Sequence, residues 1–391
     1  MKKFRALSLI LLLAINMQVT VFAIEANEQA PSMNVNAKSA LLMEPSTGKI
    51  LLEQNAHEKL PPASVTKVMT MLLIYEALDN GKIKWDDVVT ISEHAAGMGG
   101  SQIYLEAMEQ QSVRDLVKSI VIASANDSAV GMAEFIAGSE DGFVVMMNQK
   151  AAELGMHNTN FANACGLDAD NHLTSAYDIA LMTRELITKY PDVYEYSTIW
   201  MDSIIHRTAR GEEEFGLSNT NRLIKSYKGA TGLKTGSTSK ALYCISATAN
   251  RDGMQQIAVV MGSPDPNTRF HEAMKMFDYG FANYSVSLGE PAGTVKGSVK
   301  VFKGGLEEVP VEIKTQVSCL VAKGKSGTLE EKAELLGSLS APFDKGAKAG
   351  EIVYYFEGKE VGRSDLVATE AVGKASLTDI LGRLIMGWYS F

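Results

Sequence analysis

The stretch Pro61-Pro62-Ala63-Ser64-Val65-Thr66-Lys67, which leads into the apolar segment Val68 to Ile74, decides the interpretation of this chain. The apolar segment ends near Asn80-Gly81, so it predicts a buried helix with Ser64 at its N-terminus. Residues three apart lie on one helical face, which brings the Ser64 hydroxyl close to the Lys67 amine. An unprotonated lysine can take the proton of a hydroxyl and make it a nucleophile. The stretch therefore predicts a serine nucleophile with a lysine base.

Two further short motifs follow in order along the chain, Ser124-Ala125-Asn126 and Lys234-Thr235-Gly236. We expect Lys234 to be a second cation beside Lys67, where burial and like charge would together lower the pKa of the amine. Free backbone N–H groups at the N-terminus of the nucleophile helix suit an oxyanion at a carbonyl under attack. S-x-x-K, S-x-N and K-T-G in this order indicate an acyl-transfer enzyme.

The structural context of the second and third motifs can also be predicted. Ser112 with Asp115 three residues later resembles a capping box ahead of an amphipathic helix, so Ser124 falls in a tight loop between two helices. The β-rich segments 242–249 and 257–261 flank a turn and predict a hairpin, which places Lys234 on a strand bordering an antiparallel sheet. The strands 39–43 and 49–53 precede the nucleophile helix. These elements predict an α+β fold.

The chain resembles the penicillin-binding D-alanyl-D-alanine carboxypeptidases of low molecular weight. The resemblance extends from the three motifs to Asn163 with Gly166-Leu167 and to segment 257–262, and covers nearly everything after the first 35 residues. It implies a β-lactamase/transpeptidase-like domain, an antiparallel sheet flanked by helices plus a helical subdomain, then a small all-β domain and an amphipathic C-terminal helix. The tail is most similar to the sporulation-associated carboxypeptidases of endospore-forming Gram-positive bacteria.

The resemblance implies a role for each site residue. Ser64 attacks the D-Ala-D-Ala peptide bond of peptidoglycan stem peptides, Lys67 takes its proton, and Ser124 relays a proton to the leaving amine. Penicillins would acylate the same serine. The substrate-binding set implied is Asn126 for the penultimate amide, Lys234, Thr235 and Arg269 for the terminal carboxylate, Gly236 for close approach of substrate backbone, and Ser237, whose N–H joins that of Ser64 in the oxyanion hole.

One alternative and two departures accompany this set. Arg269, just before a predicted helix 271–277, could be a surface arginine instead. Leu242 stands where a glycine is frequent in the family, and Ser237 stands where Gram-positive members often have an aromatic residue. These two departures concern substrate preference more than catalysis.

The sequence patterns divide the chain into five segments with different expected roles. We expect a signal peptide at 1–23, a linker at 24–36, a serine D,D-peptidase domain at 37–284, a β-rich domain at 288–373 and a membrane-associating amphipathic helix at 375–391. The protein would then lie at the outer face of the cytoplasmic membrane or in the cell wall, including the forespore or cortex. An uncleaved N-terminal anchor and a tail helix docked on the β-rich domain are the alternatives.

Composition excludes several other classes. The formal net charge of −9 disfavours nucleic-acid binding, and three dispersed cysteines indicate neither a zinc cluster nor a disulfide framework. No cofactor or metal is expected, because segment 168–172 lacks the glycine and glutamate of a calcium loop. A serine β-lactamase and a non-catalytic penicillin-binding scaffold remain alternatives, although no Glu-x-x-x-Asn segment lies between the second and third motifs. No G-x-S-x-G elbow of a serine hydrolase is present.

Overall fold

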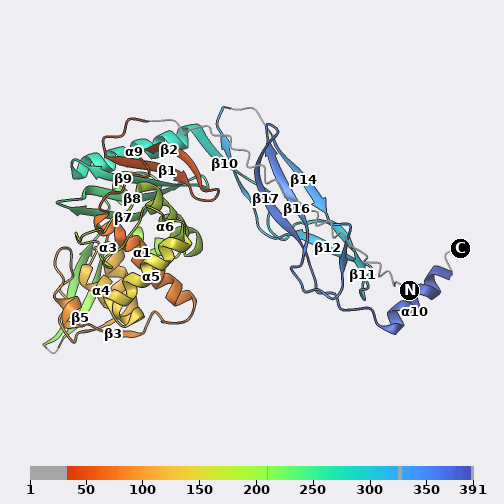
Figure 1. Ribbon diagram of the computed structural model, residues 1–391, viewed down its shortest axis with the longest axis horizontal. Coiled ribbons are helices and arrows are strands. Elements are labelled where there is room, and N and C mark those ends of the chain that lie inside the picture. Colours follow the sequence, from red (N-terminus) through yellow and green to blue (C-terminus); the bar gives the residue numbers. More distant parts are fainter. Residues whose placement is uncertain (1–32, 209, 325–327, 389–391) are drawn as a thin grey trace, which may run out of the picture.

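The computed structural model describes residues 33–208, 210–324 and 328–388, which form a mixed domain and an elongated β domain (Figure 1). The predicted α+β class is confirmed. The expected signal peptide, most of the expected linker, and residues 389–391 of the expected tail lie outside the described residues.

A five-stranded antiparallel sheet organises the mixed domain, in the order β2-β1-β9-β8-β7. Its strands are β1 (Ser39–Glu44), β2 (Lys49–Gln54), β7 (Ala230–Thr238), β8 (Leu242–Arg251) and β9 (Met254–Ser263). The predicted strands and hairpin are confirmed. The third motif lies on β7, an edge strand, as predicted.

Helices cover both faces of this sheet (Figure 1). Side chains alternate along β1, so Leu41 and Met43 pack in one core with α1, α3, α4 and α6, whereas Ala40 and Leu42 pack in a second core with α9. The helices are α1 (Lys67–Asp79), α2 (Glu93–Ala96), α3 (Val113–Ile122), α4 (Asn126–Ala137), α5 (Glu140–Glu153), α6 (Ala176–Lys189), α7 (Val193–Ser197), α8 (Leu223–Ser226) and α9 (Pro266–Asn283). Two short strand pairs complete the domain, β3 (Val88–Thr90) with β4 (Gln110–Ser112), and β5 (Met201–Thr208) with β6 (Gly211–Ser218).

The nucleophile segment differs slightly from the prediction. Ser64 lies in a 3-10 turn, η1 (Ala63–Thr66), which continues directly into α1. Ten of the thirteen residues of α1 are buried, because its sequence is apolar all round and helices enclose it. The middle motif lies between α3 and α4, and the predicted cap at Ser112 is confirmed by a 3.0 Å hydrogen bond to its Oγ from the N–H of Asp115.

The β domain contains a six-stranded sheet in the order β14-β16-β17-β12-β11-β15. Its strands are β11 (Val295–Phe302), β12 (Glu308–Ile313), β14 (Leu329–Leu335), β15 (Ser338–Ser340), β16 (Lys348–Phe356) and β17 (Lys359–Ala368). A separate antiparallel pair, β10 (Tyr284–Leu288) and β13 (Ser318–Ala322), joins it to the mixed domain, and Leu320 of β13 packs in the core beneath α9.

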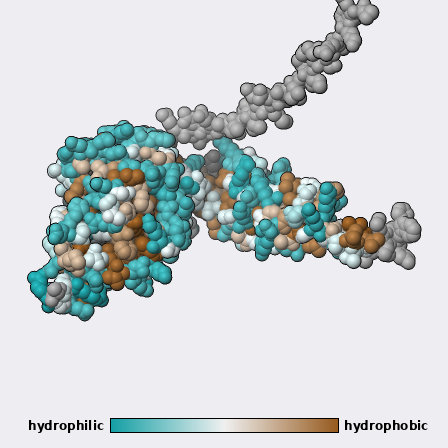
Figure 2. All heavy atoms as spheres, turned by 60° about the horizontal axis from the view of Figure 1, so that its bottom comes forward, coloured by the Kyte–Doolittle hydropathy of each residue, from teal (hydrophilic) through white to brown (hydrophobic). Residues whose placement is uncertain are grey.

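Helix α10 (Leu377–Trp388) lies at the end of the β domain farthest from the mixed domain (Figure 1). Leu377, Ile380 and Leu381 are exposed by 80%, 46% and 57%, and brown surface marks this end in Figure 2. These three side chains therefore leave much of their apolar surface uncovered. Among the described residues, no helix combines the length and apolar character needed to cross a bilayer.

Candidate active site

The Lys67 amine is enclosed by three hydrogen-bond partners from three parts of the chain. Its Nζ lies 3.2 Å from Ser64 Oγ, 2.5 Å from Asn126 Oδ1 and 2.7 Å from the Cys165 carbonyl oxygen. The side chain is fully buried, whereas Ser64 is partly exposed. The amine is thus held against the hydroxyl that the sequence analysis paired with it.

Burial lowers the pKa of Lys67 from 10.5 to about 8, because the ammonium form loses its hydration. We expected Lys234 to lie beside Lys67 as a second basic group, and the two amines are close enough to repel each other. The pKa of Lys234 is itself well below its usual value, first through burial and then through repulsion by Lys67 and Arg269. Burial is thus the first cause of the lowered pKa of both lysines.

Asn126 is held from both ends of its amide. Its Nδ2 donates a 2.6 Å hydrogen bond to the Gly99 carbonyl, which can only accept, so its Oδ1 must face Lys67. Its backbone N–H donates to the Ser101 carbonyl at 2.7 Å. The adjacent buried carboxylate of Asp127 accepts from the backbone N–H groups of Ile103 and Leu105. Residues 99–105 thus fix the position of Asn126 against the amine.

Two glycines allow other segments to reach the backbone of Ser64. A Cβ on Gly236 would lie 2.8 Å from the Ser64 nitrogen and 2.9 Å from the Val65 nitrogen. A Cβ on Gly166, whose φ is +91°, would lie 2.0 Å from the Ala63 carbonyl oxygen. The absent side chain of Gly236 makes room for the nucleophile turn, and its role in the close approach of substrate backbone stays a prediction.

The other residues of the third motif lie on the same strand, with different partners. Lys234 is buried and its Nζ donates to the Thr235 carbonyl at 3.2 Å. The Thr235 hydroxyl donates to Thr220 Oγ1 at 2.7 Å. Ser237 is exposed beside them. The strand thus carries a buried amine, a hydroxyl and an exposed end next to Ser64.

Arg269 is not a surface arginine. It lies in the first turn of α9, which begins at Pro266, five residues earlier than the predicted helix, because Asp265 caps it. Its Nη1 donates to the carbonyls of Gly236 and Cys244, at 3.0 and 3.2 Å. Its Nε is buried without a hydrogen-bond partner in the described part of the chain. The guanidinium therefore places positive charge directly behind the third motif.

Ser124 is brought near the site without a direct link to either lysine. It is buried, and its φ of +63° is unusual for a residue with a side chain. Within the described segments, no hydrogen bond joins its hydroxyl to Lys67 or Lys234. Leu242 also has a positive φ, +58°, which explains in backbone terms why glycine is frequent at this place.

Sequence reasoning missed the supports of the nucleophile turn. Asn163 Oδ1 accepts from the Gly166 N–H at 2.6 Å and so shapes the loop that presents the Cys165 carbonyl to Lys67. His172 Nδ1 accepts from the Ala162 N–H, so Nε2 carries the proton and donates to Thr66 Oγ1 at 2.8 Å. Burial lowers the pKa of His172 to about 4, which keeps this tautomer neutral. Of these supporting residues, only Asn163 and Gly166 could be recognised in the sequence, as part of the family resemblance.

Comparison with known families agrees with this geometry. The family model described as D-alanyl-D-alanine carboxypeptidase matches residues 24–265, and the model described as the C-terminal domain of penicillin-binding protein 5 matches residues 290–374. The chain is 41% identical over 392 residues to D-alanyl-D-alanine carboxypeptidase DacF of Bacillus subtilis, with 100% of both chains covered. It is 35% identical to DacC of Escherichia coli, with 90% of this chain and 88% of the relative covered.

Solved structures show the same arrangement of domains. Penicillin-binding protein 5 from Haemophilus influenzae superposes with a TM-score of 0.72 and 32% identity, covering 88% of this chain and 99% of its own. A peptidoglycan synthesis regulatory factor (PBP3) from Streptococcus pneumoniae superposes with a TM-score of 0.71 and 28% identity, covering 87% and 100% of the two chains. This chain therefore belongs to the D-alanyl-D-alanine carboxypeptidase family of penicillin-binding proteins.

Proposed function

We propose that this protein removes the terminal D-alanine from peptidoglycan stem pentapeptides through an acyl-enzyme on Ser64, and that penicillins acylate the same residue. The observation that carries the proposal is the set of three partners around Lys67. An ammonium group can donate to all three. A neutral amine has only two N–H groups and one lone pair, and two of its partners are carbonyl oxygens that cannot give up a proton.

The lone pair of the neutral amine consequently faces the Ser64 hydroxyl, the one partner that carries a proton. Ser64 then attacks the carbonyl of the D-Ala-D-Ala bond while Lys67 takes the proton. The proton passes to the nitrogen of the leaving D-alanine, through Ser124 in our proposal. Lys67 is then neutral again, accepts a proton from water as water attacks the ester, and returns a proton to Ser64.

Positive charge around the third motif supports recognition of the terminal carboxylate. Arg269 lies behind Gly236 and Lys234 lies beside Thr235, so a carboxylate placed along β7 meets two basic side chains and a hydroxyl. A bound carboxylate would raise the pKa of Lys234 and favour its charged form. The N–H groups of Ser64 and Ser237 are our proposed oxyanion hole, and Asn126 our proposed contact to the substrate amide.

The surroundings of the enzyme belong to the same proposal. We propose a signal peptide at 1–23, a linker at 24–36, a peptidase domain at 37–284, a β-rich domain at 288–373, and a tail at 375–391 that lies on the outer face of the cytoplasmic membrane. The exposed Leu377, Ile380 and Leu381 support the tail assignment, because an apolar helical face binds a lipid interface. A role in sporulation, at the forespore or cortex, rests on the resemblance of the tail alone.

The test combines the purified protein with a muropeptide pentapeptide and with a fluorescent penicillin. The wild-type protein should release free D-alanine, detected by mass spectrometry, and should retain the label for minutes, whereas a β-lactamase would hydrolyse it within seconds. Ser64→Ala should abolish both signals while its thermal unfolding stays close to that of the wild type. An unchanged pentapeptide would rule out the proposed reaction, and labelling of the variant would rule out Ser64 as the nucleophile.

A further inference from the structure

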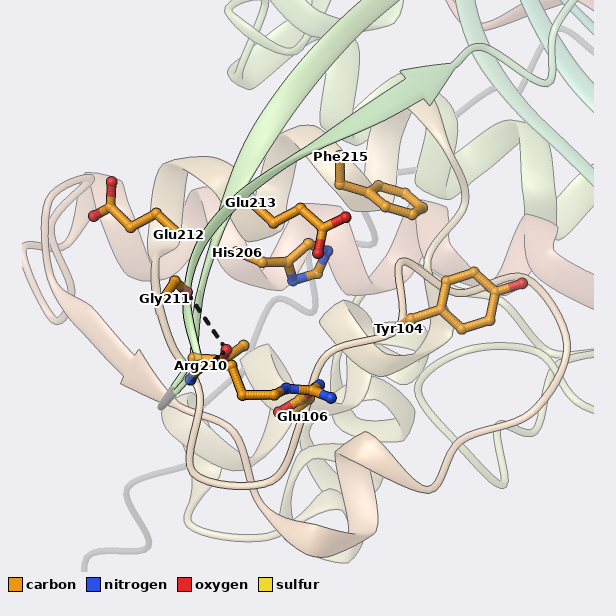
Figure 3. Close-up of a pocket in the computed structure, with 9 residues that line it drawn as sticks. Tyr104, Glu106, His206, Arg210, Gly211, Glu212, Glu213 and Phe215 are labelled. Atoms are coloured by element: carbon orange, nitrogen blue, oxygen red, sulfur yellow. Dashed lines mark hydrogen bonds and ion pairs between the residues drawn. The ribbon is translucent and has the colours of Figure 1, made fainter.

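A cavity of about 440 Å³ lies apart from the three motifs, between the β5–β6 hairpin and the loop that precedes β4 (Figure 3). Tyr104 and Phe215 line it, with ring centroids 6.0 Å apart in an edge-to-face contact. Phe215 also contacts the ring of His206, 5.3 Å away. The cavity thus has an aromatic wall next to a titratable ring.

The charged groups of the cavity leave an excess of negative charge. Arg210 forms an ion pair with Glu106, so the positive charge of its guanidinium is already balanced. Glu213 also lines the cavity, and its carboxylate has no ion-pair or hydrogen-bond partner among residues 33–208, 210–324 and 328–388. In Figure 3, Glu213 projects to the same side of the hairpin as His206, while Glu212 projects the opposite way. A cation would neutralise the Glu213 carboxylate.

His206 adds an independent acceptor. The residue is only 9% exposed, and its Nδ1 lies 2.7 Å from Oε1 of the buried Glu109. Because the Glu109 carboxylate also accepts from Gln111 Nε2 and from the Glu106 N–H, it is an acceptor, and His206 Nδ1 carries the proton. In the tautomer with a single proton, on Nδ1, Nε2 is a hydrogen-bond acceptor, and no described residue donates to it. A carboxylate, an imidazole acceptor and aromatic rings are together the partners of an ammonium group.

The cavity is connected to the active site through one short loop. Ser101 accepts from the Asn126 N–H, and Tyr104 follows three residues later. Consecutive Cα atoms are about 3.8 Å apart, so Tyr104 lies within roughly 11 Å of Ser101. An extended peptide advances about 3.4 Å per residue. The Tyr104 side of the cavity is therefore one short loop away from Asn126.

We propose that this cavity is a subsite for the ammonium group on the side chain of the stem-peptide residue that directly precedes D-Ala-D-Ala. The inference rests on the proposed function, since it assigns the peptide cleaved at Ser64. Glu213 supplies the opposite charge, His206 Nε2 accepts one N–H, and the ring of Tyr104 covers the alkyl stem. The subsite selects peptides with a free side-chain amine over those in which the amine is blocked.

The experiment compares two peptides of equal length, acetyl-L-lysyl-D-Ala-D-Ala and the same peptide acetylated at the lysine Nε. For the wild-type enzyme, kcat/KM should be about tenfold higher for the free amine, the usual size of one charge-assisted hydrogen bond. Glu213→Gln should reduce this ratio to nearly one without changing the rate on the acetylated peptide. Glu212→Gln is the matched control and should keep the ratio. Glu212 also borders the cavity, but its carboxylate pairs with Arg207 and is directed away from His206 (Figure 3).

The possible results distinguish failure of the subsite proposal from failure of the proposed reaction. Equal rates on both peptides in the wild type, or an unchanged ratio in Glu213→Gln, would overturn the subsite while leaving the proposed function in place. No D-alanine from either peptide would overturn both. Equal acylation of the two variants by penicillin, which has no such amine, shows that Ser64 is intact in each.

Discussion

The mixed domain and the β domain differ most in how many charged side chains they bury. In the described part of the chain, the buried charged side chains all lie in the mixed domain: Glu44, Lys67, Glu109, Asp127, Asp178, Lys234, Arg269 and Glu272. The β domain buries one polar side chain there, Ser364. Removing a charge from water is costly unless hydrogen bonds replace its hydration. The chemistry is therefore confined to the domain that can supply such partners.

The cores of the two domains explain this difference. The mixed domain packs two extensive cores on the two faces of its sheet, whereas the apolar residues of the β domain form three small, separate clusters. A small core contributes too little apolar burial to offset the desolvation of a lysine. We therefore expect changes in the β domain to affect catalysis far less than changes around Ser64.

A change of pH across the pKa of Lys67 gives the largest expected effect on the rate of acylation. Burial lowers its pKa to about 8, and only the neutral amine can accept the Ser64 proton, so the reactive fraction falls as the pH drops below that value. The second-order rate constant for acylation by fluorescent penicillin should fall roughly 50-fold from about pH 8 to about pH 6. Circular dichroism over the same range controls for unfolding. A rate that stays flat across this range would show that Lys67 is not the base.

A pair of glycine substitutions compares the domains directly. Gly236→Ala forces a Cβ against the backbone nitrogens of Ser64 and Val65, which must shift, so acylation should slow by about tenfold or more. Gly337→Ala in the β domain meets no atom within 4 Å and should leave acylation unchanged. Thermal melts of both variants accompany the rates. If both substitutions slowed acylation equally, the separation of roles between the domains would be wrong.

Removing the tail has the smallest expected effect on catalysis. A chain that ends at Ala375 should cleave a soluble pentapeptide within about twofold of the full-length rate, because α10 lies far from Ser64. It should lose sedimentation with phosphatidylcholine vesicles, as should the full chain with Ile380→Glu. Vesicle binding by the truncated chain would refute the membrane role of the tail.

Much of the fold was predictable because it depends on local patterns. Apolar alternation predicted β1, β2 and the hairpin β8–β9, and the capping residue Ser112 predicted the start of α3. The S-x-x-K spacing predicted the contact of Lys67 with Ser64, since both lie within one turn. The start of α9 was missed because its cap, Asp265, lies outside the apolar pattern that was used.

The rest of the site could not be predicted, since it depends on tertiary contacts of the backbone. The Cys165 carbonyl that binds Lys67 has no side-chain signature. The contact of Gly236 with the nucleophile turn appears only when β7 packs beside η1. The lowered pKa of Lys67 also required the structure, because a sequence does not show how completely the amine is buried.

The β10–β13 pair has a consequence for the geometry of the whole enzyme. The chain passes from the mixed domain into β10 and returns through β13, whose Leu320 is anchored under α9. A single extended linker would let the two bodies swivel freely, whereas a hydrogen-bonded ribbon with an anchored side chain resists bending. The ribbon thereby limits how far the β domain can rotate relative to the domain that carries Ser64.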